Sequence, residues 1–150
     1  MRRHHEPHPP MRVHSPGEVS PMPIVYVIDD DQSIRRAFSR LLRSEDFEVY
    51  TFSCPEEFFQ APKVDENACI IADVRMSGST GFDLAEGVMT LGLKLPLIII
   101  SASDDSQTRQ RARELGAVAF FRKPVDDQAL LDAITWAISG LRKNETTGGG

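Results

Sequence analysis

Residues 24–31 read Ile-Val-Tyr-Val-Ile-Asp-Asp-Asp, an apolar run that ends in three successive carboxylates. Three further short apolar runs are also followed by a polar side chain: 68–72 before Asp73, 97–100 before Ser101, and 117–121 before Lys123. Continuous apolar runs of this length are typical of strands buried on both faces of a parallel sheet. Because parallel strands end at the same edge of a sheet, the pattern predicts that these polar groups meet there.

The residues between these runs have helical periodicity. Over 32–44 the apolar residues recur every three or four positions, and Asp31 or Ser33 can cap the start of that helix. The same reasoning predicts a strand over 47–52, a short helix from Pro55, and helices over 82–90, 105–115 (ended by Gly116) and 126–141. The alternation indicates the α/β class. We expect a flavodoxin-like, doubly wound (βα)5 three-layer sandwich whose parallel sheet has the order 2-1-3-4-5.

The chain divides into one domain and two tails. Residues 1–23 hold six of the ten prolines and all four histidines, so we expect a disordered tail whose histidines are solvated rather than metal-binding. Residues 24–141 form the predicted domain. The polar stretch 142–150, which ends in three glycines, is expected to be a flexible tail.

Composition and charge exclude several classes of function. The formal charge of −5 argues against direct contact with nucleic acid. No apolar run approaches the roughly 20 residues that span a bilayer, and none near the N-terminus resembles a signal peptide. We therefore expect no membrane contact and a cytoplasmic location. Cys54 and Cys69 are too few for a disulfide framework or a metal site.

Asp29, Asp30 and Asp73 are candidate metal ligands. Three carboxylates that meet at one sheet edge repel one another unless a cation lies among them, whereas a purely structural cluster would be costly to bury. Mg²⁺ suits a site built from oxygen ligands. A carboxylate beside Mg²⁺ can attack phosphorus, and the Ser101 hydroxyl and the Lys123 ammonium can bind phosphoryl oxygens. Taken singly, Ser101 could be a plain strand-end hydroxyl and Lys123 a solvated lysine.

Residues 23–141 resemble the receiver domain of bacterial two-component response regulators. The matching stretches are Val27-Ile28-Asp29-Asp30-Asp31, Asp73-Val74-Arg75-Met76 with Gly81 eight residues after the aspartate, Ser101-Ala102 and Lys123-Pro124. Further stretches resemble the nitrogen-fixation regulator (FixJ-like) branch: Ser33-Ile34-Arg35-Arg36, Phe47-Glu48-Val49 and Gly116-Ala117. Members of that branch often carry a C-terminal LuxR-type helix-turn-helix domain. The chain is therefore either a single-domain regulator or part of a longer transcription factor.

The resemblance implies a role for each site residue. Asp73 would accept a phosphoryl group from a sensor histidine kinase, and Asp30, Asp73 and the main-chain carbonyl of Arg75 would ligate Mg²⁺ directly. Asp29 would act through water or orient the metal. Ser101 and Lys123 would hold the phosphoryl oxygens, and the Lys123–Pro124 peptide bond is expected to be cis. Such a domain is no enzyme beyond self-phosphorylation and autodephosphorylation.

The resemblance also implies a switch. Phe120 occupies the family's aromatic switch position and would turn inward when Ser101 moves toward a phosphorylated Asp73. The face formed by helix 105–115, strand 117–121 and helix 126–141 would then change and bind a second copy or another partner. Trp136 falls off the apolar side of the last helix, so it is either exposed on that helix or packed at its edge.

The sequence departs from the family pattern at one position, and two other functions compete with the receiver interpretation. Ser77 stands where the family usually has proline, which predicts a more mobile loop over 77–80 without loss of phosphorylation. The enzyme alternative is a haloacid-dehalogenase-type phosphatase using Asp29, although Asp126 and Asp127 follow Lys123 too closely to supply its further acidic motif. A flavin-binding flavodoxin is rejected because the first loop carries carboxylates that would repel a phosphate.

Overall fold

The computed structural model describes residues 22–63, 66–76, 79–103 and 105–147. Within these ranges the side chains of 76, 79–80 and 141–147 are left undescribed. The predictions for residues 1–21 with their four histidines, for Ser77 and for residues 148–150 lie outside the described part of the chain.

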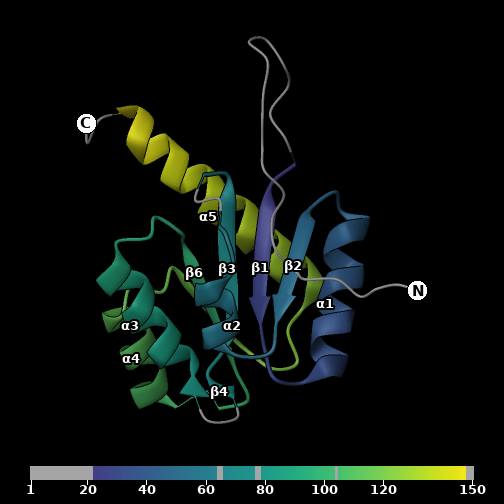
Figure 1. Cartoon of the computed structure of the whole chain (residues 1–150), viewed down its shortest axis with the longest axis vertical. Helices are drawn as coiled ribbons and strands as arrows, with labels where there is room; N and C mark the ends of the chain where they lie inside the picture. The colour runs from purple at the N-terminus through teal and green to yellow at the C-terminus, as the bar shows by residue number, and fades with distance from the viewer. Residues whose placement is uncertain (1–21, 64–65, 77–78, 104, 148–150) are drawn as a thin grey trace.

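Five parallel strands form the central sheet in the order β2-β1-β3-β6-β7 (Figure 1). Their bounds are β1 Ile24–Ile28, β2 Glu48–Phe52, β3 Ala68–Asp73, β6 Leu97–Ser101 and β7 Ala119–Arg122. The predicted strand order is confirmed. The last strand begins two residues later than predicted, because the N–H of Ala117 instead donates to Ala112 O at the end of the preceding helix (N···O 3.0 Å).

In the described part of the chain, five helices cover the two faces of this sheet. They are α1 Gln32–Ser44, α2 Pro55–Gln60, α3 Gly81–Leu91, α4 Ser106–Glu114 and α5 Asp127–Thr147. Of the two caps that the sequence allows, the structure has Asp31, which accepts the N–H of Ser33 at 2.8 Å. The backbone of Gly116 has φ +89° just after α4, a conformation that glycine adopts without strain.

The last helix is longer than predicted. The apolar periodicity stops at Leu141, yet α5 continues to Thr147, and no glycine or proline interrupts the chain between Leu141 and Gly148. The expectation of a flexible tail over 142–150 therefore does not describe residues 142–147, which are helical.

Alternate residues of each strand enter one of two cores. Tyr26 and its neighbours on one face pack against α2, α3 and α4, while Val25 and its neighbours on the other face pack against α1 and α5. The strands β1 and β3 are completely buried along their lengths, which explains their continuous apolar character. The strands that lead to Asp29 and Asp73 are thus held by packing on both faces of the sheet.

A small antiparallel hairpin follows β3 and was not predicted. It pairs β4 (Arg75–Met76) with β5 (Ser79–Thr80) and leads directly into α3. Strands of two residues carry no periodicity that a sequence pattern could reveal. Among the described helices, none combines the length and the apolar character that crossing a membrane requires.

Candidate functional site

The site lies at the carboxyl edge of the sheet, where the strand arrows of Figure 1 end. Asp29 follows β1, Asp73 ends β3, Ser101 ends β6 and Lys123 follows β7. The register pairs Asp73 with Ile100, and the N–H of Lys123 donates to Ser101 O at 2.8 Å. The structure therefore gathers the predicted strand-end groups from four strands in one place.

Three carboxylates form the centre of the site. Oxygen atoms of Asp29, Asp30 and Asp73 all lie within 4.8 Å of one another. Asp29 is completely buried, Asp73 is 7% exposed, and Asp30 faces solvent. Asp29 and Asp73 are thus shielded from water, whereas Asp30 lies on the solvent-exposed side of the cluster.

Burial dominates the electrostatics of Asp29. Loss of hydration raises the pKa of its carboxyl, the N–H of Asp31 bound to Oδ1 at 2.9 Å partly offsets this, and the charge of Asp73 raises the pKa further. A nearby cation would favour the charged form of this carboxyl and so oppose the rise in its pKa.

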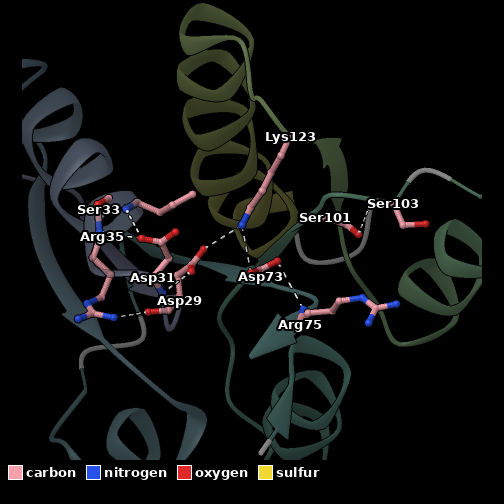
Figure 2. A network of polar contacts seen from close by, with 10 residues as sticks. Asp29, Asp31, Ser33, Arg35, Asp73, Arg75, Ser101, Ser103 and Lys123 are labelled. Carbon is pink, nitrogen blue, oxygen red and sulfur yellow. Dashed lines mark hydrogen bonds and ion pairs between the residues drawn. The ribbon is translucent and has the colours of Figure 1, made fainter. Parts of the chain in front are cut away.

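Lys123 extends its ammonium between two of these carboxylates (Figure 2). Its Nζ lies 3.1 Å from Asp73 Oδ2 and 3.4 Å from Asp29 Oδ2. Burial lowers the pKa of Lys123, but the hydrogen bond to Asp73 and the charge of Asp29 outweigh burial, so the pKa is raised overall. The peptide bond from Lys123 to Pro124 is cis, as expected.

Ser101 is buried beside the cluster with 1% of its surface exposed. Its Oγ accepts the N–H of Ser103 at 3.0 Å, and Figure 2 shows the two serines on the other side of Asp73 from Asp29. Because a hydroxyl has one donor and two acceptor positions, accepting this N–H leaves the Ser101 hydrogen available for another oxygen.

The segment after Asp73 fits closely against it. The N–H of Arg75 lies 3.4 Å from Asp73 Oδ1, and the guanidinium of Arg75 points away from the carboxylates in Figure 2. Gly81 brings the start of α3 against the same strand end, since a Cβ there would lie 2.6 Å from Asp73 O. This close approach explains a glycine eight residues after the aspartate.

Two contacts at the site were missed by the sequence reasoning. Arg35 Nη1 donates to Asp29 O at 2.6 Å, and Arg109 lies over the Phe120 ring at 4.9 Å from its centroid. Neither has a local sequence signal, because each depends on how a helix is rotated against the sheet. Phe120 itself is half-buried against the α2–α3–α4 core, and Trp136 is 61% exposed on α5.

The donor set fits a divalent cation. Three carboxylates and one ammonium leave an excess of negative charge in a largely buried place, which two positive charges would balance. Carboxylate oxygens are ligands that Mg²⁺ accepts while it keeps several waters. Asp126, by contrast, lies at the start of α5, where its carboxylate accepts the N–H of Ala129 at 2.9 Å.

Comparison with known proteins gives a consistent family. The family model described as response regulator receiver domain matches residues 25–135. Nodulation protein W of Bradyrhizobium diazoefficiens is 38% identical over 84% of this chain and 56% of its own length. Other curated relatives are named transcriptional regulatory proteins. The chain spans about half the length of the curated relatives it matches.

Solved structures agree with the sequence matches. The structure of the response regulator StyR is 36% identical, with a TM-score of 0.76 over 84% of this chain and 64% of that one. The crystal structure of FixJ-N is 29% identical, with a TM-score of 0.71 over 78% of this chain and 94% of that one. The similarity to FixJ-N supports the predicted FixJ-like branch.

Proposed function

The chain belongs to the response regulator receiver family of two-component signalling, and from this we propose that Asp73 is its phosphoacceptor and that Mg²⁺ is required for the transfer. One observation carries the proposal: Asp73 ends a central strand, pairs with the Lys123 ammonium at 3.1 Å and lies within 4.8 Å of two further carboxylates. Receiver domains are signalling proteins rather than enzymes with a diffusing substrate. Self-phosphorylation and autodephosphorylation are the expected extent of catalysis, and a cytoplasmic location stays a prediction.

The proposed reaction is an in-line displacement at phosphorus. An oxygen of the ionised Asp73 carboxylate forms the new P–O bond while the P–N bond to the histidine of a sensor kinase breaks, and the leaving imidazole keeps the bonding electron pair. Mg²⁺ would neutralise charge on the phosphoryl oxygens. Asp30, Asp73 and the Arg75 carbonyl would hold the ion directly, and Asp29 would hold it through water or by orientation.

Lys123 and Ser101 would bind the transferred group. The ammonium already pairs with Asp73 Oδ2, so a small movement of its flexible stem would let it follow a phosphoryl oxygen. The free hydroxyl hydrogen of Ser101 would donate to another oxygen. The modification adds roughly −1.5 to −2 charges at Asp73, which these donors offset.

The proposed output is a change of the face made by α4, β7 and α5. If Ser101 moves toward the phosphoryl group, Phe120 turns inward and shifts the population between two packings of this face. Arg109 on α4 contacts the Phe120 ring, so the position of the ring is coupled to α4. The exposed Trp136 on α5 suits binding of a second copy or another partner.

The relatives suggest where the signal goes. Several relatives are transcriptional regulatory proteins, and the matched stretch covers only about half of their length. We therefore expect the receiver to control transcription through a further domain or through a partner, without touching nucleic acid itself.

Acetyl phosphate or beryllofluoride with Mg²⁺ tests the proposal. The expected result is one phosphoryl group mapped to Asp73 by mass spectrometry, none in Asp73→Asn, and a shift toward dimer in light scattering. Trapping on Asp29 would instead support the phosphatase alternative, and no modification at Asp73 would overturn the assignment.

A further inference from the structure

Arg35 contacts the acidic segment 29–31, which follows β1, from the side opposite Lys123. It lies in the second turn of α1, is half-buried, and its Nη1 donates to the main-chain oxygen of Asp29 at 2.6 Å (Figure 2). We propose that Arg35 is a positioning residue that fixes the relative orientation of the Asp29 and Asp30 carboxylates for Mg²⁺. The inference rests on the proposed function, because it concerns the same metal site.

The geometry of the peptide bond carries the argument. The carbonyl that Arg35 holds belongs to the planar peptide unit joining Asp29 to Asp30, so fixing its oxygen fixes the plane between the two Cα atoms. The N–H of Asp29 is held as well, since it donates to Phe52 O at 3.1 Å. With both sides of Asp29 fixed, the direction in which the Asp30 side chain leaves the backbone is constrained.

The next residues continue the same chain of contacts. The N–H of Asp31 donates to Asp29 Oδ1 at 2.9 Å, and the Asp31 carboxylate caps α1, the helix that carries Arg35. These contacts form a closed cycle: Asp29 at the end of β1 binds the N–H of Asp31, Asp31 caps α1, and Arg35 of α1 binds the main-chain oxygen of Asp29. Arg35 supplies the link that returns to Asp29, and no other described contact between side chain and backbone makes that return.

Charge alone would have the opposite effect on the metal. A guanidinium near three carboxylates repels a divalent cation, and a cation in the first turns of a helix also opposes the helix dipole. Removing Arg35 should therefore tighten Mg²⁺ binding if only its charge matters. It should weaken Mg²⁺ binding if Arg35 orients the ligands. The sign of the change separates the two roles.

The experiment compares Arg35→Ala with Arg36→Ala in the whole chain. Arg36 carries the same charge on the same turn but is exposed, so it reports the charge effect alone. Mg²⁺ affinity is measured by calorimetry, and exchange of the Asp31 amide hydrogen is measured by NMR without metal. We expect Arg35→Ala to weaken Mg²⁺ about tenfold, the low end for residues that orient metal ligands. Arg36→Ala should stay within about twofold of wild type, because exposed charges are screened.

Amide exchange gives a readout that needs no metal. In Arg35→Ala the Asp31 amide should exchange about tenfold faster, because its hydrogen bond to Asp29 Oδ1 should open more often once Arg35 no longer holds the Asp29 backbone. Arg35→Lys keeps a charged donor and should recover most of the affinity. If Arg35→Ala does not fold, Arg35→Gln and Arg36→Gln are compared in the same way.

The possible outcomes separate the two proposals. Mg²⁺ affinity in Arg35→Ala equal to or tighter than in Arg36→Ala, or unchanged Asp31 exchange, overturns the positioning role. Failure of the wild-type chain to bind Mg²⁺ would instead refute the proposed function.

Discussion

Replacing Asp29 by asparagine should stabilise the metal-free chain. The side chain is fully buried, and its carboxylate oxygen lies within 4.8 Å of those of Asp30 and Asp73. At an effective dielectric constant of about 20, each repulsion at 4.8 Å is worth about 3.5 kcal/mol, or about 7 kcal/mol for the two. The attraction between Asp29 and Lys123, at 3.4 Å, stabilises the ionised carboxylate by about 5 kcal/mol at the same dielectric constant.

The balance favours the neutral side chain by about 2 kcal/mol before the hydration of the carboxylate is counted. For a chain of this size that free energy corresponds to a rise of roughly 4 to 8 °C in Tm. The assay is thermal unfolding at pH 7.5 in EDTA. Asp132→Asn, at an exposed position on α5, is the matched control and should change stability by no more than about 0.5 kcal/mol.

The pH dependence of this effect has a definite sign. Because the pKa of Asp29 is raised in the folded chain, the folded state binds more protons than the unfolded state just above pH 3.8, the ordinary value for this carboxyl. The contribution of Asp29 to the stability of the wild type therefore falls as the pH rises through that window. The advantage of Asp29→Asn should be present at pH 7.5 and should shrink as the pH is lowered below the raised pKa.

Mg²⁺ should reduce the difference in the free energy of unfolding between wild type and Asp29→Asn. Ligand at about 100 times its Kd adds about 2.7 kcal/mol to the free energy of unfolding, and the gain should be larger for wild type than for a variant that lacks one acidic group. Lower stability of Asp29→Asn in EDTA would show that attraction to Lys123 outweighs the repulsion, and would refute the reasoning.

Three further predictions concern other parts of the chain. Cys69 is fully buried and burial raises its thiol pKa to about 12, so a thiol reagent at pH 8 should label only Cys54 in the native chain, and Cys54→Ser should abolish the fast labelling. Gly81→Ala would place a Cβ 2.6 Å from Asp73 O, so it should lower the free energy of unfolding by about 1–3 kcal/mol in denaturant titrations; wild-type stability would contradict the packing argument. Phe120→Ala should leave phosphorylation of Asp73 intact but weaken dimerisation of the phosphorylated chain, measured by sedimentation, by roughly tenfold; unchanged dimerisation would count against the switch.

Much of the fold was readable from the sequence because its signals are local. The continuous apolar run 24–28 predicts a strand buried on both faces, and the periodicity of 32–44 predicts α1 with the bounds that the structure shows. The strand order followed from the rules for parallel sheets. The hairpin β4–β5 and the extension of α5 to Thr147 were missed, since two-residue strands have no period and the end of an apolar stripe does not end a helix.

The sequence by itself determined which groups meet at the sheet edge. Asp29, Asp73, Ser101 and Lys123 follow apolar runs, and parallel strands must bring such positions together whatever the details of packing. Only the tertiary structure decided how these groups are held and charged. The contact of Arg35 with Asp29 depends on the rotation of α1 against β1, and the raised pKa of Asp29 depends on burial by several elements at once. Local sequence patterns determine whether a segment forms a helix or a strand. The contacts and the hydration of a side chain, in contrast, depend on segments that are far apart in the chain.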